Sequence, residues 1–437
     1  MAFVLGLYLL ILACSLGLRW ADLRHLRRHC GVVPPELAGT IDPHTLSRVS
    51  AYTVESGRLD TLQMLAETAV AGVFLFAGLL GTYDAWIGRR GLSFVWSGIF
   101  FFAGLIVAES VLRIPFSLLH HFRVERRHGF NRMGFRLWAS DWAKSLGLAL
   151  VLGSILAGGA LLLVARSPVW WWLWVWVFFL IFSLLLLYVS PYVIEPLFFK
   201  LEPVRTAGLE ESIRELLGRA GLRAARVFQM DASRRSAHSN AYFTGLGRVK
   251  RIVLFDTLVQ QLDTDEILAV LAHEAGHWKR RHVRKRIAVT EAIALGVLFA
   301  ASRLIGAPSL PRLFGLATAS FPARAVMLVA IGGLLAFPLT PLASWLSRRY
   351  EWEADRFAAD LTRAPERLAS ALAKLARENL SNLHPHPLYS RFYDSHPPVV
   401  ERIRHLRPRP DGTGAGVAPA GSADRTVGDS AGGSGSP

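Results

Sequence analysis

The chain has 437 residues, 52% of them hydrophobic, and a mean hydropathy of +0.33, which argues against a set of soluble domains and favours a membrane protein. Its net charge of +16 would indicate nucleic acid binding in a soluble protein. Here the basic residues lie in the connections between apolar runs, as membrane topology predicts, so we expect no nucleic-acid partner. Two cysteines, Cys14 and Cys30, are too few for a disulfide framework or a cysteine-type zinc site.

Seven apolar runs are long enough to cross a bilayer, which needs about 20 residues. They cover residues 2–18, 62–86, 91–112, 142–165, 169–189, 283–304 and 325–346. The first run lacks the basic start of a signal peptide, so we interpret it as a retained membrane helix. The pattern predicts an integral, multi-pass membrane protein.

Arginine and lysine concentrate in alternate connections, those after the first, third, fifth and seventh runs. By the positive-inside rule, the N-terminus faces outward, and the long fifth connection and the C-terminus face the cytoplasm. Lysine is scarce beside arginine, which favours a bacterial source and therefore the bacterial inner membrane.

Four acidic residues lie inside the predicted spans: Glu67, Asp84, Glu109 and Glu291. Acids at membrane depth are often functional, but they also pair with neighbours such as Arg113. Both interpretations stay open, and we assign these residues no catalytic role.

The fifth connection has the character of a soluble domain. We expect an amphipathic helix at residues 210–217 and short strands at 226–231, 237–245 and 251–256. Further helices are expected at 345–361, from Pro365 to about residue 380, and from Pro397 to about residue 406. We therefore divide the chain into a membrane region (1–190), a second domain that includes the last two spans (191–407), and a disordered tail (408–437).

One stretch carries a recognisable metal-binding pattern, His-Glu-x-x-His at residues 273–277. Asp263 and Glu266 resemble a capping box that begins its helix. Positions four apart share a helix face, so His273 and His277 can bind one metal ion. Glu274 is then placed to take a proton from metal-bound water. The alternative is a chance match.

A catalytic zinc site usually has three protein ligands, and candidates for the third lie in residues 349–355. Spacing alone does not choose among Glu351, Glu353 and Asp355. Glu351 and Asp355 share a helical face and could serve as a ligand and the residue that supports it. Alternatively, these carboxylates are solvated partners of the neighbouring arginines.

Several segments accompany the HExxH motif in a characteristic order. They are Arg-Arg-His-Gly-Phe-Asn (126–131), Val-Ile-Glu-Pro-Leu-Phe (193–198), Ser-Asn-Ala-Tyr-Phe (239–243), Ile-Val-Leu-Phe-Asp-Thr (252–257), the Glu351 and Asp355 pair, and Ser-His-Pro-Pro (395–398). With this set the chain resembles the type I CAAX prenyl protease family, integral-membrane zinc metallopeptidases of the gluzincin type. The resemblance extends from the N-terminus to about residue 406.

The resemblance implies roles for individual residues. Glu351 is the third zinc ligand, and Asp355 supports the site from behind. Asn240 lies on a strand edge that aligns the substrate backbone. His396 and Arg402 approach the substrate or the oxyanion. Without the resemblance, His396 reads as an ordinary loop histidine and Asn240 as an ordinary turn or strand residue.

The resemblance also implies a fold: a mainly α, polytopic membrane protein. Seven transmembrane helices enclose a chamber, and a cytoplasmic zincin-like metallopeptidase domain contains a small β-sheet. The implied function is a zinc-dependent endopeptidase that hydrolyses peptide bonds near the C-terminus of prenylated CAAX-type substrates, with one zinc ion as cofactor. Its partners are a peptide or protein substrate, with or without a prenyl group, and the lipid bilayer. The alternatives are a quality-control metalloprotease without prenyl specificity and a non-catalytic membrane scaffold.

Overall fold

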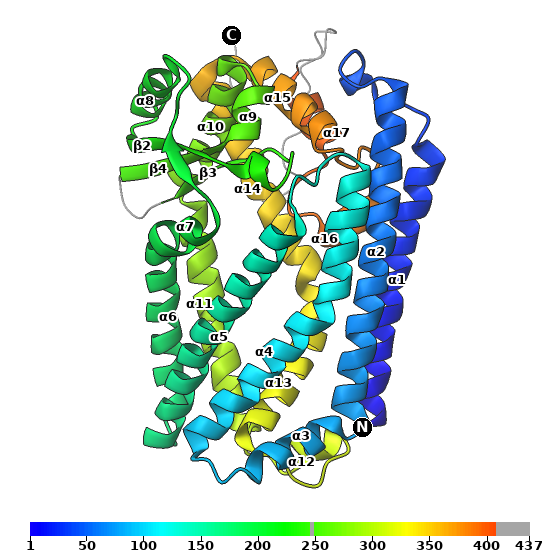
Figure 1. The fold of residues 1–437 in the computed structure, drawn as a ribbon, viewed down its shortest axis with the longest axis vertical. Coiled ribbons are helices and arrows are strands. Elements are labelled where there is room, and N and C mark those ends of the chain that lie inside the picture. Colours follow the sequence, from blue (N-terminus) through cyan, green and yellow to red (C-terminus); the bar gives the residue numbers. More distant parts are fainter. Residues whose placement is uncertain (245–248, 408–437) are drawn as a thin grey trace, which may run out of the picture.

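The computed structural model describes residues 1–244 and 249–407. Within these ranges, seven helical stretches are long and apolar enough to cross a membrane. They are formed by α1 (Ala2–His29), α2 (Pro43–Phe76), α4 (Phe94–Leu119), α5 (Phe135–Arg166), α6 (Trp171–Val189), α11 (His282–Leu304), and α13 (Phe321–Ala336) with α14 (Thr340–Thr362). They extend between the two ends of the molecule (Figure 1), which confirms the expected mainly α architecture with seven spans.

The predicted bounds of the second span, residues 62–86, are wrong. Helix α2 begins at Pro43, where the Asp42 side chain accepts a hydrogen bond from the Thr45 amide at 2.7 Å, and it ends before Gly78. Gly78 has φ +84, a left-handed conformation that suits glycine, and it precedes the separate helix α3 (Leu79–Gly88). The helices of the first, third and fourth spans, which are α1, α4 and α5, also extend past their apolar runs. An apolar run indicates the part of a helix that lies in the membrane, whereas the capping residues determine where the helix begins and ends.

The seventh span is two helices rather than the single run expected at residues 325–346. A 3₁₀ turn at Phe337–Leu339 separates α13 from α14, and Pro338 in that turn has no backbone N–H to donate. The helix expected at 345–361 is confirmed as part of α14. Two π-helical turns, His120–Glu125 and Ser190–Ile194, extend α4 and join α6 to α7 (Glu195–Phe198).

A four-stranded sheet lies at one end of the molecule (Figure 1). Its strands are β1 (Leu201–Pro203), β2 (Arg223–Met230), β3 (Ala241–Thr244) and β4 (Val249–Phe255), in the order β1-β2-β4-β3. β2 and β4 are parallel and the other pairs are antiparallel. The three expected strands are confirmed, while three-residue β1 was missed. β3 pairs only with β4 among the described strands, so its outer edge is free to accept another strand.

The main apolar core joins this sheet to the helices beside it, with buried residues such as Ile213, Ile252 and Leu271. These helices are α8 (Leu209–Arg219), α9 (Asp256–Gln261), α10 (Thr264–Lys279), α15 (Pro365–Glu378) and α17 (Val399–Leu406). The remaining short elements are α12 (Ser309–Leu313), α16 (Pro387–Tyr393) and two 3₁₀ turns, Pro35–Leu37 and Ala232–Arg234. The helices predicted from the fifth connection and after the seventh span are confirmed.

The two ends of the molecule differ in character. The N-terminus, α3 and α12 lie at one end, and the sheet, α10 and α15 lie at the other (Figure 1). The basic-residue pattern predicts this relative arrangement, and the compartment that each end faces stays a prediction. The predicted disordered tail, residues 408–437, lies outside the described residues.

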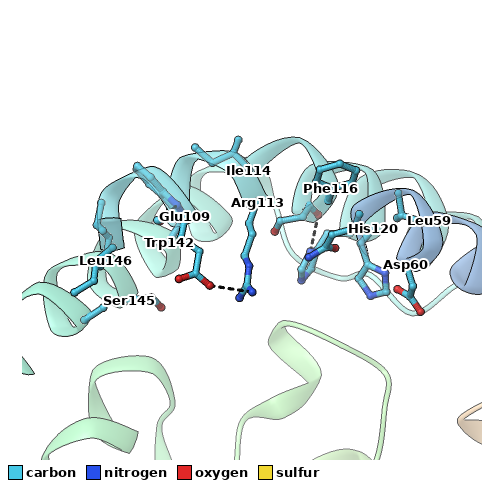
Figure 2. A pocket seen from close by; sticks show the side chains of 16 residues that line it. Leu59, Asp60, Glu109, Arg113, Ile114, Phe116, His120, Trp142, Ser145 and Leu146 are labelled. Atoms are coloured by element: carbon cyan, nitrogen blue, oxygen red, sulfur yellow. Dashed lines mark hydrogen bonds and ion pairs between the residues drawn. The ribbon is translucent and has the colours of Figure 1, made fainter. Parts of the chain in front are cut away.

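A cavity of about 620 Å³ lies between α2, α4 and α5 (Figure 2). Glu109 and Arg113 extend from α4 into the same space in Figure 2, and Arg113 contacts both Glu109 and Glu67 at 2.9 Å. The side chains of Glu109, Arg113 and Glu67 are 60%, 53% and 31% exposed, although all three lie within long apolar helices. Hydrocarbon does not accept exposed charges, so we expect water in this space.

The pairing interpretation therefore holds for Glu67 and Glu109. Asp84 also has a partner, since its carboxylate accepts a hydrogen bond from the Ser320 amide at 2.8 Å. Glu291 differs, because it is buried and one of its carboxylate oxygens has no hydrogen bond within the described chain.

Candidate metal centre

The helix that carries the HExxH motif is fixed at its start. The predicted capping box is confirmed: the Glu266 amide donates to Asp263 Oδ1 at 2.9 Å, and the Asp263 amide donates to Glu266 Oε2 at 3.0 Å. Glu266 is 1% exposed and also binds Lys374 Nζ and Ser370 Oγ of α15, each at 2.7 Å. These contacts hold α10 in a defined position against α15.

Helix α10 packs closely against α14. A Cβ atom on Gly276 would lie 3.0 Å from Ala354 Cα, which is tighter than an ordinary packing contact, so a larger residue would require the two helices to shift by a few tenths of an ångström. Ala272, Ala275 and Ala358 are fully or almost fully buried, as are Gly276 and Ala354. Small residues thus bring the helix of the two histidines against the helix of the acidic residues.

The structure brings His273, His277 and Glu351 together. His273 Nε2 lies 3.2 Å from His277 Nε2 and 3.3 Å from Glu351 Oε2. His277 Nε2 lies 3.3 Å from Glu351 Oε1. The three side chains are 8%, 21% and 6% exposed. They form a group whose donor atoms all lie within 4.8 Å of one another.

The donor set fits a divalent metal ion. Glu351 Oε2 is buried and has nitrogen neighbours, yet none of the described groups donates a hydrogen bond to it. Two imidazole Nε2 atoms facing each other and a carboxylate need a shared cation or protons between them. Two histidine nitrogens and one carboxylate oxygen are ligands that zinc commonly takes in catalytic sites.

Asp355 and Arg402 lie behind His273. Asp355 Oδ1 is 2.7 Å from His273 Nδ1, so the ring donates its Nδ1–H and turns its other nitrogen toward Glu351. Arg402 holds Asp355 with two hydrogen bonds, at 2.6 and 2.9 Å. Burial lowers the pKa of His273, but the neighbouring carboxylates of Asp355 and Glu351 raise it to about 9. A proton retained there must leave when a metal binds.

Arg402 itself is almost fully buried. Burial lowers the pKa of its guanidinium, but the hydrogen bonds and charge of Asp355 raise it above its ordinary value. Its Nη1 lies 3.8 Å from Glu351 Oε2. Arg402 is thus a permanent buried cation that contacts the carboxylates of α14.

Two further predicted residues lie beside this group. Glu274 is half-buried, and its carboxylate has no hydrogen bond or ion pair with any described residue. The His396 side chain is 63% exposed, and its Nδ1 lies 2.8 Å from Glu351 Oε2. His396 and Arg402 both line a cavity of about 570 Å³, beside Arg19 and Asp22 of α1. A bound molecule could therefore reach His396 from this cavity.

Asn240 precedes the free-edged strand β3. It is exposed, its side-chain oxygen accepts from the Ala241 amide at 2.8 Å, and its carbonyl accepts from the Phe255 amide at 3.0 Å. Its carbonyl therefore continues the pairing of β3 with β4 by one residue.

Sequence reasoning missed His282. This residue begins α11, and its Nδ1 lies 3.1 Å from Nδ1 of His277. Its Nε2 contacts Glu353, which the sequence left open as a ligand and which lies outside the converging group. A third histidine five positions after His277 was the signal available, but no helical period links the two.

Two family descriptions cover nearly the whole chain. Residues 22–200 match the CAAX prenyl protease N-terminal region of five membrane helices. Residues 203–409 match peptidase family M48.

Individual proteins of this kind are similar over most of their length. CAAX prenyl protease 1 homolog of Arabidopsis thaliana is 33% identical over 405 residues, covering 89% of this chain and 93% of that protein. CAAX prenyl protease 1 of Saccharomyces cerevisiae is 36% identical over 322 residues, covering 70% and 71%. The crystal structure of S. mikatae Ste24p matches with a TM-score of 0.86 at 28% identity, covering 92% of this chain and 98% of that one.

Proposed function

Because this chain belongs to the CAAX prenyl protease 1 group of peptidase family M48 and is a membrane metalloendopeptidase, we propose that it is a zinc enzyme that cleaves prenylated CAAX-type substrates near their C-terminus. The observation that carries the proposal is the convergence of His273, His277 and Glu351 between α10 and α14. These residues would hold one zinc ion, with Glu274 beside it.

Glu274 is the general base of the proposed reaction. His273, His277 and Glu351 would hold a zinc ion, which would supply Lewis-acid polarisation of the scissile carbonyl and of the attacking water. Glu274 follows ligand His273 directly and has a carboxylate without a partner in the described chain, so it is available to accept the proton of the attacking water. It then passes that proton to the leaving amine.

His396 and Arg402 differ in their reach toward the substrate. The exposed His396 ring borders both Glu351 and the 570 Å³ cavity, so it can donate to a developing oxyanion. Arg402 binds Asp355 with two hydrogen bonds, so its main role in this proposal is to hold Asp355 against His273. A direct contact between Arg402 and substrate stays a prediction.

The free edge of β3 is the proposed binding site for the substrate backbone. An extended peptide can add to an exposed strand edge through main-chain hydrogen bonds, which tolerate different side chains. Asn240, exposed at the start of this edge, would align the peptide. The prenyl group would enter the interior between the membrane helices, where burial of each CH₂ contributes about 0.8 kcal/mol.

The orientation in the membrane is part of the proposal. We keep the end that holds the metal centre on the cytoplasmic side, because the basic connections lie at that end. We also keep residues 1–190 as the membrane region and 191–407 as the peptidase domain. The relatives named above are eukaryotic and give no support to a bacterial membrane.

The test uses purified full-length protein in detergent and a pair of peptides that differ only in the prenyl group on the CAAX cysteine. We expect about one zinc per chain, cleavage that a chelator abolishes, and faster cleavage of the prenylated peptide. Glu274→Gln serves as the inactive control, and mass spectrometry locates the cleaved bond.

Two outcomes would favour one of the competing functions. Equal cleavage of both peptides, together with cleavage of unfolded membrane proteins, would favour a quality-control protease. Zinc-loaded protein that cleaves neither would favour a non-catalytic scaffold. Either result contradicts the proposal.

A further inference from the structure

The His277 ring contacts a second histidine that the proposed reaction does not use. His277 Nδ1 lies 3.1 Å from His282 Nδ1, and the two rings meet edge to face. The His282 side chain is 2% exposed, so no solvent competes for its nitrogens. A buried imidazole needs a partner for each polar nitrogen.

The other nitrogen of His282 meets a carboxylate. His282 Nε2 lies 3.1 Å from Glu353 Oε2. An ionised carboxylate only accepts hydrogen bonds, so the proton of a neutral His282 ring is on Nε2 and its Nδ1 is an acceptor. His277 must then donate its Nδ1–H to His282. The lone pair of His277 Nε2 is left facing Glu351, at 3.3 Å from Oε1. The contacts assign these proton positions.

The same tautomer arises at His273 by a shorter route, because Asp355 accepts its Nδ1–H directly at 2.7 Å. One helix therefore supplies three acidic groups at alternate positions: the ligand Glu351, and Glu353 and Asp355, which act on the two histidines. His277 is connected to Glu353 through the ring of His282, whereas His273 contacts Asp355 directly.

The chain geometry holds His282 in this position. Arg281, the residue before it, has φ 59, a left-handed conformation that separates α10 from α11. The His282 ring stacks on Tyr350 of α14 with centroids 4.2 Å apart and an interplanar angle of 12°. Arg349 lies 3.4 Å from the second oxygen of Glu353. The ring is fixed on both its edge and its face.

We propose that His282, held by Glu353, is a positioning residue that fixes His277 in the Nδ1–H tautomer and thereby sets the metal affinity of the centre. The inference rests on the proposed function only in taking His277 as a metal ligand. Partners of this kind typically change metal affinity by about 10–100-fold when they are removed.

The test compares two substitutions at one position in the full-length protein. His282→Phe keeps an aromatic ring to stack on Tyr350 but removes the acceptor, whereas His282→Gln retains a carbonyl oxygen that can accept from His277. Zinc affinity is measured by competition with a chelator, and cobalt-substituted protein reports ligand geometry through its visible absorption. We expect His282→Phe to weaken zinc binding about 10–100-fold and alter the cobalt spectrum, and His282→Gln to restore most of both.

A matched control is His128→Phe. The His128 side chain is also largely enclosed, at 9% exposed, and it also contacts a carboxylate, Glu55, at 3.0 Å. It contacts none of the metal-binding residues, so zinc affinity should be unchanged. The thermal midpoint of the metal-free protein should be the same for His282→Phe and the unmodified chain.

Wild-type zinc affinity in His282→Phe would overturn the proposal. So would a loss of affinity that His282→Gln fails to restore and that accompanies a large drop in the metal-free midpoint, because a packing role predicts that pattern. A protein that binds zinc but cleaves no CAAX-type peptide would contradict the proposed function and leave these affinity measurements valid, so the two ideas fail separately.

Discussion

The metal centre and the wall of the membrane cavity both contain arginine–carboxylate pairs at nearly the same distance, yet they differ in environment. Arg402 contacts Asp355 at 2.6 Å with side chains 10% and 4% exposed. Arg113 contacts Glu67 at 2.9 Å with side chains 53% and 31% exposed. Exposed pairs contribute about 0–1 kcal/mol, whereas breaking a buried pair costs about 3–5 kcal/mol. The distances therefore do not predict which ion pair contributes more to stability, whereas the burial of the side chains does.

The largest effect is expected at the ligand that joins the two helices of the centre. Glu351→Ala removes one of three donors, so the purified protein should lose its zinc and all measurable cleavage. Metal analysis and a peptide assay check this. Full zinc occupancy in this variant would show that Glu351 is not a ligand.

A second substitution separates chemistry from metal binding within the centre. Glu274→Gln is isosteric, and Glu274 makes no hydrogen bond or ion pair with a described residue, so zinc should stay bound while the cleavage rate falls by about 10²–10⁴-fold. The checks are the rate under saturating substrate and the metal content of the same sample. Cleavage at the normal rate would contradict the assignment of the base.

The third prediction tests the buried pair directly. Arg402→Met keeps much of the apolar stem and removes the charge, leaving Asp355 buried without its cation. We expect a loss of about 3–5 kcal/mol in the free energy of unfolding, measured by denaturant titration of metal-free protein in detergent. A loss below about 1 kcal/mol would place this pair in the same class as the exposed ones.

The smallest effect on the free energy of unfolding is expected at the cavity wall, for a substitution matched to Arg402→Met. Arg113→Met breaks contacts with Glu67 and Glu109, which are partly exposed, so the same titration should shift by about 0–1 kcal/mol. A shift as large as that of Arg402→Met would mean that the cavity excludes water.

The features of this molecule that depend on a single helix could be predicted from its sequence. The four-residue spacings of His273 with His277, and of Glu351 with Asp355, determine which side chains share a face. The bounds of α6 and α11 were also predicted closely, because an apolar run ends near both ends of each helix.

Features that depend on contacts between distant segments were not accessible in the same way. Arg402 reaches Asp355 across 47 positions of sequence, and only the family resemblance drew attention to it. His282 depends on the left-handed turn at Arg281 and on a stack with Tyr350, and neither follows from a periodic pattern. The start of α2 was missed because its first turns are too polar to mark a span.

The 3₁₀ turn between α13 and α14 has a consequence for how lipid acts on the ligands. A bilayer of unsuitable thickness tilts the helices that cross it, and a continuous helix of 42 residues would carry that tilt along its whole length to Glu351. Bending at Phe337–Leu339 would let α13 tilt with the bilayer while α14 stays packed against Gly276 of α10. We therefore expect zinc occupancy to be insensitive to the acyl-chain length of reconstituted vesicles, because bending at the turn would absorb the tilt of α13 before it reaches Glu351.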